Sequence, residues 1–302
     1  MRADSKHYGK SMNWDMNRLG SVFRGRASGY SARSTGRRTD EFLRQLGNVP
    51  VIAGVVWRTA VVAVRMILLF RRHGERWSVR KRGRMLWASA SRVWARWIME
   101  RIEVTVHAKG LDEVDWSRAY VIASNHQSTL DVVALVDLIP AARFVAKKEV
   151  RYIPFVGRAC RMGGQVIIDR SDHVQSMAAV RKALVDWPDG TIVFFSEGTR
   201  VEGERLGVFK KGAFAIARET GLSILPVAIA GARRVLPRGS LLKIEHGGSI
   251  GVTFGQPISP EGRTVPELCD YTRSVIGDML DADPLETGPV GAYTDASHSD
   301  GH

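Results

Sequence analysis

The stretch from Asn125 to Asp131 contains a histidine and an aspartate, two residue types that together can act as a general base. A carboxylate bonded to one imidazole nitrogen fixes the tautomer, stabilises the protonated ring and leaves the other nitrogen free to remove a proton. The spacing between His126 and Asp131 is loose, and a loop histidine beside a first-turn helix acid explains it as well. The pair is therefore a candidate whose weight depends on the motifs that follow.

The elements around this pair determine where it lies. Residues 119–123 are apolar and typical of a strand, whereas residues 130–138 have the pattern of a helix for which Ser128 or Thr129 is the expected N-cap. His126 is then expected on the loop at the end of a strand, with Asp131 in the first turn of the next helix. Ligands and chemistry usually collect at that position in an open α/β sheet.

Basic side chains follow three further predicted strands, and a fourth lies on the loop after the last of them: Lys147, Arg170, Arg200 and Lys210. The strand ends place these cations at the same general edge as His126. Cations beside a general base describe a site that binds a phosphate and deprotonates a neighbouring group. Each cation also has a structural explanation, as part of a surface ion pair or a solvated helix start.

From about residue 103 onward, short strand patterns alternate with helix patterns. The strands are expected at residues 103–108, 119–124, 143–146, 165–168, 191–195, 224–230, 241–246 and 250–254, and the helices at 130–138, 174–186, 212–220 and 265–281. The last helix has a capping box formed by Thr264 and Glu267. This alternation predicts an α/β domain, residues 103–281, with a mixed sheet flanked by helices.

The composition indicates an anionic partner. The chain has 302 residues, 44% of them hydrophobic, and a formal net charge of +13. Nucleic acid, an anionic membrane surface and a phosphorylated substrate all fit that charge. The two cysteines form neither a disulfide framework nor a metal-ligand spacing, which fits a reducing compartment. The N-terminus has no early apolar segment of a secretory signal.

The N-terminal third predicts an appendage to this domain. Residues 1–48 are polar and basic and are expected to be disordered, as is the tail, residues 282–302. Residues 49–70 form the most apolar run, and its length approaches the ~20 residues of a spanning helix. Arg58 and Arg65 lie on one helical face, and each would cost about 2.5–3.5 kcal/mol at the centre of a bilayer. The run therefore favours an interfacial helix, with a buried amphipathic helix as the alternative.

The next residues continue the membrane pattern. Residues 71–84 are strongly basic, like a juxtamembrane loop on the cytoplasmic side, and residues 85–102 form a second helical stretch with three tryptophans. Residues 49–102 are thus expected to be a membrane-associated helix–loop–helix. Nucleic acid is the rival partner for the basic loop, but we find no nucleic-acid-binding motif, and the flanking helices are too apolar.

Four blocks in order resemble the 1-acylglycerol-3-phosphate acyltransferases of the glycerolipid acyltransferase family. That family has an Asn-His-x-x-x-x-Asp block, a block ending in Ile-Asp-Arg, a Phe-Pro-Glu-Gly-Thr-Arg block and a Pro-containing strand. The matching residues here are Asn125, His126, Asp131, Ile168, Asp169, Arg170, Phe195, Glu197, Gly198, Thr199, Arg200 and Pro226. The resemblance covers about residues 100–260. Ser196 departs from the family pattern, which has Pro at that position.

The resemblance implies acyl transfer from acyl-CoA or acyl carrier protein to the free sn-2 hydroxyl of lysophosphatidic acid, giving phosphatidic acid in phospholipid biosynthesis. It implies His126 as general base and Asp131 as the residue that orients it. The implied substrate-binding residues are Lys147, Arg170, Glu197, Gly198, Thr199, Arg200 and Lys210. Glu197 is expected to orient the turn or an acceptor hydroxyl. Backbone N–H groups near Gly198 or Ser128 are expected to stabilise the oxyanion.

A thioester is already activated, so the expected reaction needs no metal, no cofactor and no covalent enzyme intermediate. The expected location is the cytoplasmic face of the plasma membrane. Three alternatives stay open: another lysophospholipid acceptor, a lipid hydrolase with Ser196 or Ser128 as nucleophile, and a non-catalytic membrane-binding protein. The absence of a Gly-x-Ser-x-Gly elbow argues against the hydrolase. Intact His126 and Asp131 argue against a non-catalytic protein.

Overall fold

The computed structural model describes residues 32–73, 81–139, 141–187, 190–201, 206–239 and 241–283. The chain divides into two units, Met1–Leu43 and Arg44–His302, and the sheet and the candidate site lie in the second. Residues 1–31, 74–80 and 284–302 lie outside the described residues, so the disorder predicted for residues 1–31 and for most of the C-terminal tail is not tested, and half of the predicted basic loop is not described.

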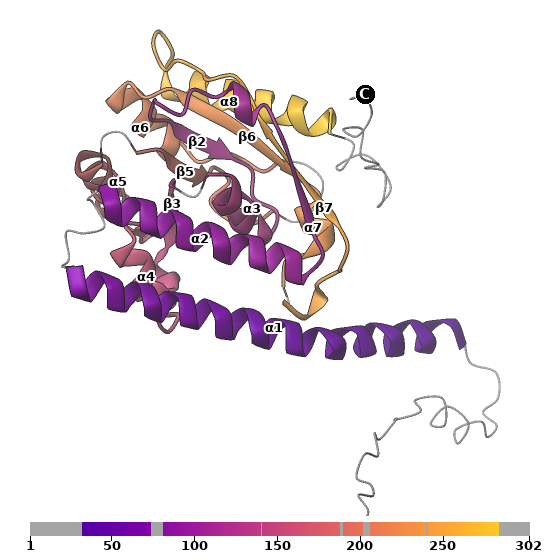
Figure 1. Cartoon of the computed structure of the whole chain (residues 1–302). Helices are drawn as coiled ribbons and strands as arrows, with labels where there is room; N and C mark the ends of the chain where they lie inside the picture. Colours follow the sequence, from indigo (N-terminus) through magenta and orange to yellow (C-terminus); the bar gives the residue numbers. More distant parts are fainter. Residues whose placement is uncertain are drawn as a thin grey trace, which may run out of the picture. The chain divides into compact units, whose positions relative to one another are not determined.

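Seven strands form one mixed sheet in the order β1-β7-β6-β2-β5-β3-β4 (Figure 1). Their bounds are Thr105–Lys109, Val121–Ser124, Arg143–Lys147, Val166–Ile168, Ile192–Phe195, Ile224–Ala230 and Ser249–Phe254 for β1 to β7. The strands β2 to β6 all run in one direction, because every pairing among them is parallel. The β6–β7 pair is antiparallel and the β1–β7 pair is parallel, so β1 and β7 run the opposite way. The predicted α/β fold with a mixed sheet is confirmed.

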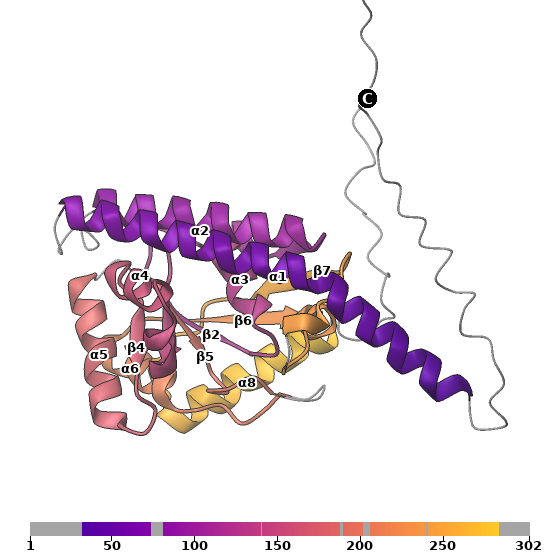
Figure 2. The same ribbon diagram turned by 90° about the horizontal axis from the view of Figure 1, so that it is seen from below.

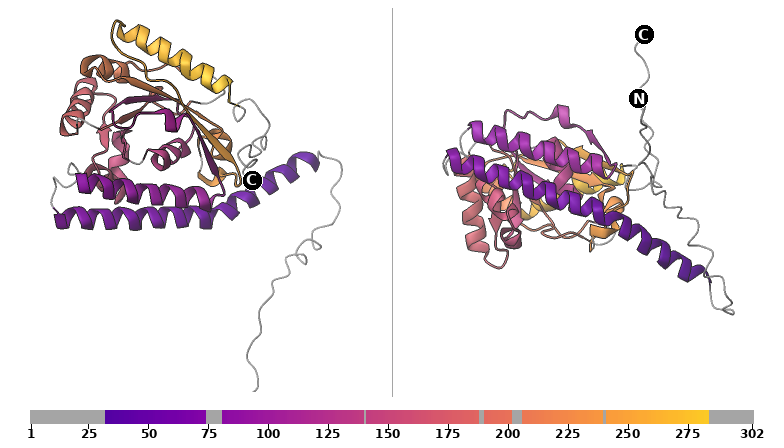
Figure 3. Two further views of the ribbon diagram at one scale, coloured as in Figure 1. Left: turned by 45° about the horizontal axis from the view of Figure 1, so that its top comes forward. Right: turned by 60° about the horizontal axis from the view of Figure 1, so that its bottom comes forward.

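Helices cover both faces of this sheet. One face carries α2 (Lys81–Arg101), α3 (Leu130–Leu138) and α7 (Ala232–Val235), and the other carries α5 (His173–Asp186), α6 (Gly212–Thr220) and α8 (Val265–Asp281). Figure 3 shows this layering, with α8 and α6 on one side of the sheet and α3 and α2 on the other. Short 3₁₀ turns, η3 (Leu111–Glu113), η4 (Lys148–Tyr152) and η5 (Leu241–Lys243), complete the domain.

The central strands are apolar on both sides because both faces are covered. In β2, Ile122 packs into the core beneath α2 and α3, whereas Val121 and Ala123 pack into the core beneath α5, α6 and α8. All four residues of β2 are buried. The strand that leads to the candidate base is thus fixed from both faces of the sheet.

The long helix α1 (Ala32–His73) lies beside α2 and α4 (Val156–Met162) from Arg44 onward (Figures 1 and 2). The indole N–H of Trp94 in α2 donates to the hydroxyl of Thr59 at 2.9 Å, and the guanidinium of Arg58 lies 4.6 Å from the ring centroid of Trp97. Residues 44–69 are long and apolar enough to cross a membrane, by length and composition alone. Trp57 is 73% exposed, so part of the apolar surface of α1 points outward.

Several element predictions differ from the structure, and one of them is the start of α2, which begins at Lys81 and not at residue 85. The first helix was expected to begin at Val49 but begins at Ala32, so the prediction of disorder is wrong for residues 32–48. The strand expected at residues 241–246 is also wrong, because only the 3₁₀ turn η5 forms there. The buried amide of Asn48 donates to the carbonyl oxygens of Leu242 and Ile244, groups that a strand would have used in its ladder. The short helices α4 and α7 were not predicted.

The remaining element predictions agree closely with the structure. The predicted capping box at the start of α8 is present, since Thr264 and Glu267 exchange side-chain-to-backbone hydrogen bonds.

The alternative interpretation of Pro226 as an edge-strand residue is wrong, because β6 lies between β7 and β2. Regular pairing with β7 begins only at Val227, and an isolated bridge joins Ile224 to Ile258. The ladder is therefore irregular beside Pro226, which lacks an N–H group.

Candidate active site

His126 and Asp131 form a close pair at the carboxyl end of β2. The Nδ1 atom of His126 lies 2.8 Å from Oδ2 of Asp131, and the Asp131 side chain is fully buried. The same oxygen accepts from the backbone N–H groups of Gln127 and Ser128, at 2.7 and 2.8 Å. Because Oδ2 accepts both backbone hydrogen bonds, the imidazole is expected to donate to it from Nδ1. Nε2 is then the nitrogen that can accept a proton.

The loop that presents His126 is tied to the neighbouring strand. The side-chain amide of Asn125 donates to the carbonyl oxygen of Ile229 in β6 at 2.9 Å and accepts from its N–H at 2.8 Å. The buried hydroxyl of Ser128 donates to the carbonyl oxygen of Leu236 at 2.7 Å. The two Asn125 bonds continue the β2–β6 pairing after β2 has ended, and the Ser128 bond ties the loop to the end of α7. The residue that follows Asn125 is therefore held in register with the sheet.

Glu197 ties the same loop to β5. One carboxylate oxygen accepts from the backbone N–H of His126 at 2.8 Å, and the other accepts from the N–H of Gly207 at 2.7 Å. Burial raises the pKa of Glu197 above its ordinary value, and the two backbone N–H groups oppose that shift. These bonds are those of a residue that orients the loop, one of the two roles the sequence left open. A direct contact of Glu197 with an acceptor stays a prediction.

The ring of His126 lies against Phe195 at the end of β5. The two rings stack with centroids 4.0 Å apart and planes 20° from parallel. The His126 side chain is 16% exposed, and it lines a cavity of about 590 Å³. The imidazole of His126 is thus held in place, shielded on one face and open to this cavity.

The cavity connects the sheet edge with the N-terminal helices. Around His126 it is lined by polar and basic residues, namely Thr129, Lys147, Arg170, Thr199, Arg200 and Arg238. Elsewhere the lining is largely apolar and comes from α1, α2, α3, β3 and α4, including Val62, Met66, Trp87, Trp94, Val133, Phe144 and Ala159. A cavity with one charged end and a long apolar lining suits a ligand with an anionic head and a hydrocarbon chain.

Three of the four predicted cations meet at this cavity. Lys147, Arg170 and Arg200 all line it, and the Arg200 guanidinium donates to the hydroxyl of Thr129 at 3.0 Å. Thr129 is the N-cap residue of α3 but makes no side-chain cap bond, because its hydroxyl faces Arg200 instead. Lys210 is not among the cavity-lining residues. Its side chain lies beside Gly198, 3.3 Å from the position that a Cβ atom on this glycine would occupy.

The N–H groups of Ser128 and Gly198 are used within the protein. The N–H of Ser128 donates to Asp131, and the N–H of Gly198 donates to the carbonyl oxygen of Phe195 at 2.9 Å. Gly198 has a φ of 75°, a conformation that glycine adopts without steric cost, and it closes the turn after β5. That other backbone N–H groups near these two residues stabilise an oxyanion stays a prediction.

Sequence reasoning missed two contributors to the site. Arg238 lines the cavity and donates to the backbone carbonyl of Arg200 at 3.1 Å. It follows β6, whose carboxyl end lies at the same sheet edge, so the rule that found the other cations would have found it. The pairing of Asn125 with Ile229 has no local signal, because it joins residues 104 positions apart.

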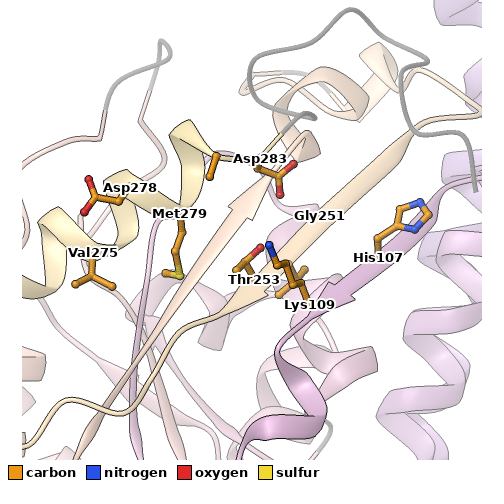
Figure 4. Close-up of a pocket in the computed structure, with 10 residues that line it drawn as sticks. His107, Lys109, Gly251, Thr253, Val275, Asp278, Met279 and Asp283 are labelled. Atoms are coloured by element: carbon orange, nitrogen blue, oxygen red, sulfur yellow. The ribbon is translucent and has the colours of Figure 1, made fainter. Parts of the chain in front are cut away.

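A second cavity, of about 350 Å³, lies against β1, β7 and the C-terminal end of α8 (Figure 4). Figure 4 shows Lys109, Thr253, Asp278 and Asp283 around it, and none of the predicted site residues. Within the described part of the chain, no three residues of the types His, Cys, Asp and Glu come together as a metal site would require. The chemistry that the residues can do is concentrated at His126.

The comparisons with known proteins agree on one family. Residues 103–230 match the model of the family described as Acyltransferase. The chloroplastic 1-acyl-sn-glycerol-3-phosphate acyltransferase of Arabidopsis thaliana is 34% identical over 178 residues, which cover 58% of this chain and 49% of the relative. The 1-acyl-sn-glycerol-3-phosphate acyltransferase of Saccharomyces cerevisiae is 31% identical over 173 residues, 54% of this chain and 55% of the relative. The chain thus spans about half the length of these relatives.

One solved structure shares the fold over nearly its whole length. The crystal structure of the 1-acyl-sn-glycerophosphate acyltransferase PlsC from Thermotoga maritima aligns with a TM-score of 0.64. The alignment covers 82% of this chain and 98% of that chain, at 24% sequence identity. The likeness shows a common architecture.

Proposed function

We propose that this protein transfers a fatty acyl group from an acyl thioester to the free sn-2 hydroxyl of lysophosphatidic acid, because residues 103–230 match the acyltransferase family model. The product is phosphatidic acid, an intermediate of phospholipid biosynthesis. The observation that carries the proposal is the His126–Asp131 pair at the charged end of an otherwise apolar cavity. Both relatives compared above bear the name of this activity.

The mechanism uses His126 as general base. Nε2 takes the proton of the acceptor hydroxyl as its oxygen forms a bond to the thioester carbonyl carbon. The buried carboxylate of Asp131 stabilises the resulting imidazolium, and such base assistance contributes typically ~10²–10⁴-fold in rate. The C–S bond then breaks, and the thiolate receives the proton from His126. The reaction proceeds by direct transfer, with no covalent enzyme intermediate.

Recognition of the acceptor follows from the lining of the cavity. The phosphate of lysophosphatidic acid pairs with Arg200, Lys147 and Arg170, since guanidinium groups bind phosphate by two parallel hydrogen bonds and Lys adds a point charge. The hydrocarbon chain occupies the apolar part, between α1, α2 and α4. An acceptor without a phosphomonoester would leave several of these cations unpaired.

The donor is acyl-CoA or acyl carrier protein. Both are anionic, which suits a chain with a net charge of +13. A thioester is already activated toward attack, so we infer that no metal or cofactor takes part. The outward apolar surface of α1 and the basic composition fit an anionic membrane surface, and we propose the cytoplasmic face of the plasma membrane as the location.

The hydrolase alternative lacks a suitable nucleophile. Ser128 is buried and its hydroxyl donates to the carbonyl oxygen of Leu236, whereas Ser196 is 3% exposed and its hydroxyl has no hydrogen-bond partner among the described residues. Neither hydroxyl is bonded to His126, as a nucleophilic serine beside its base would be.

The test measures acyl transfer by the purified full-length protein in detergent. Oleoyl-CoA and oleoyl-acyl carrier protein are offered with lysophosphatidic acid or lysophosphatidylcholine, and also without acceptor. We expect phosphatidic acid from the wild type, at least a hundredfold loss in His126→Ala, and normal rates in His173→Ala, which changes an exposed histidine of α5. Activity on lysophosphatidylcholine alone would overturn the acceptor. Free fatty acid without acceptor would support the hydrolase.

A further inference from the structure

A strained turn joins η4 to α4 at the rim of the cavity that His126 lines. Phe155 has φ 61° and ψ −44°, and the N–H of Val156 donates to the carbonyl oxygen of Pro154 at 2.6 Å. These values describe a γ-turn centred on Phe155. A bulky residue rarely adopts a positive φ, and such residues persist only where the surrounding structure holds them.

The flanking residues hold this turn in place. The N–H of Gly157 donates to the carbonyl oxygen of Ile153 at 3.0 Å. A Cβ atom on Gly157 would collide with the carbonyl oxygens of Val150 and Arg151, so only glycine allows α4 to start this close to η4. The first turn of α4 is thus packed directly on η4, and this close packing fixes the direction of the tip between them.

The strained turn points large apolar side chains outward. Tyr152 is 74% exposed, Phe155 is 54% exposed and Ile153 is 49% exposed. If this backbone strain were needed for packing in the core, the side chain of Phe155 would be buried. Instead, this side chain faces solvent. The feature that the turn secures is therefore an exposed apolar tip, which we define as residues 152–155.

The charges around the tip fit an anionic lipid surface. From residue 147 to residue 161 the only acid is Glu149, whereas the bases are Lys147, Lys148, Arg151, Arg158 and Arg161. Lys148 is paired with Asp169 at 2.8 Å. Arg151 and Arg158 are exposed on either side of the tip. Aromatic and aliphatic residues ringed by arginines are typical of segments that enter the headgroup region of a bilayer.

The position of the tip makes this contact useful. Val150, Ile153 and Val156 line the cavity that contains His126, so the tip stands at its rim. Ala159 and Met162 of α4 pack against Ala63 and Ile67 of α1, the helix that is long and apolar enough to cross a membrane. Figures 1 and 2 both show α4 beside α1. The tip is thus continuous with the other surface that suits a lipid environment.

We propose that the tip, residues 152–155, inserts into the headgroup region of an anionic bilayer and holds the rim of the cavity against the lipid. An amphipathic ligand then passes from the bilayer into the cavity without its hydrocarbon chain crossing water. That this ligand is lysophosphatidic acid rests on the proposed function. The insertion itself does not, because it is measured without turnover.

The first test places an environment-sensitive fluorophore on the tip of the full-length protein. A Cys160→Ala/Cys269→Ala background carries Phe155→Cys, labelled with nitrobenzoxadiazole, and the matched control carries Tyr271→Cys on α8, at a side chain that is 50% exposed. On phosphatidylcholine vesicles containing phosphatidylglycerol, the tip probe should brighten, shift to the blue and be quenched by doxyl groups placed shallowly in the acyl chains. The control probe should do none of these. If the tip probe is unchanged while the protein is bound to vesicles, the proposal is overturned. It is also overturned if the fluorescence changes without vesicles, on self-association or on addition of acyl carrier protein, and does not change with them.

The second test uses the backbone strain. Phe155→Gly removes the side chain and suits a positive φ, so the variant should fold with an unchanged or higher Tm. Its partitioning onto the same anionic vesicles should weaken by about tenfold, because one large apolar side chain no longer enters the lipid. A lower Tm with unchanged partitioning would show that Phe155 serves packing and would overturn the role given to the tip. Turnover of a short-chain, monomeric acceptor separates this result from the proposed function, since it should survive in Phe155→Gly.

Discussion

The carboxylate of Glu197 accepts a hydrogen bond from the backbone N–H of His126 at 2.8 Å, across 71 positions of sequence. Asp131 holds the imidazole ring of the same histidine at 2.8 Å. Two buried acids from different segments thus fix one histidine, one through its backbone and the other through its side chain. The two contacts predict different losses when each acid is replaced.

Asp131→Asn should abolish most activity without unfolding the protein. All three donors bond to Oδ2, so the amide oxygen can keep the bonds to the N–H groups of Gln127 and Ser128, but a neutral amide no longer stabilises the imidazolium of His126. We expect kcat to fall by about 10²–10⁴-fold with a nearly unchanged Tm. Asp137→Asn on the same helix, which changes an ion pair with Arg96, is the control and should retain activity. Equal rates in wild type and Asp131→Asn would remove the pair from the mechanism.

Glu197→Gln should lower kcat more than it changes KM. The amide can accept one of the two backbone N–H groups, but its NH₂ group then faces the other donor, so the loop of His126 or that of Gly207 must shift. Glu219→Gln, in an exposed pair with Arg181, is the matched control. A rise in KM for lysophosphatidic acid with unchanged kcat would instead favour a direct contact between Glu197 and the acceptor.

The same variant should change the dependence of stability on pH. Burial raises the pKa of Glu197 in the folded state above its ordinary value of 4.5. Ionisation is then harder in the folded protein, so this residue lowers the free energy of unfolding as the pH rises from its ordinary pKa to the raised pKa. The loss is complete above the raised pKa and is recovered in acid. Denaturant unfolding at several pH values should show this contribution in the wild type and not in Glu197→Gln. Identical pH profiles would contradict the assignment.

Arg200→Lys should weaken recognition of the acceptor phosphate. Lysine keeps the charge but loses the planar fork that can bind phosphate by two hydrogen bonds and that now contacts the hydroxyl of Thr129. We expect kcat/KM for lysophosphatidic acid to fall by about tenfold, and the preference over lysophosphatidylcholine to fall with it. Arg181→Lys, which lies in an exposed ion pair, should leave both unchanged. Because lysophosphatidylcholine also carries a phosphate, as a diester, an equal loss for both acceptors would place Arg200 outside recognition of the phosphomonoester.

Cys160 offers a probe of the apolar end of the cavity. It lines the cavity beside Ala159, and burial raises the pKa of its thiol to about 11. A maleimide should react slowly at neutral pH and faster as the pH approaches that value, because the thiolate is the reactive species. The rate is measured in Cys269→Ala, and oleoyl-lysophosphatidic acid should protect the thiol because its chain occupies the same cavity. Equal protection by glycerol 3-phosphate, which has no acyl chain, would contradict that placement.

The local elements of the fold could be predicted because they follow from local patterns. The predicted bounds of α3, α6, α8 and β6 match the structure, since each has a clear apolar period and, for α8, a capping box. The strand expected at residues 241–246 failed for a non-local reason. Its carbonyl groups are taken by Asn48, nearly two hundred positions earlier, and no local pattern contains that contact.

The sequence by itself determined which residues could do the chemistry and that they lie at strand ends. His126 and Asp131 are close in sequence, and the cations follow strands whose carboxyl ends share one edge, so both statements follow from local pattern and strand direction. Only the tertiary structure decided how those residues are used. It placed Glu197 on the backbone of the base, directed Lys210 away from the cavity lining, and closed the apolar cavity between α1, α2 and α4. These outcomes depend on contacts between distant segments, whose distances and burial are set by packing rather than by the spacing of residues along the chain.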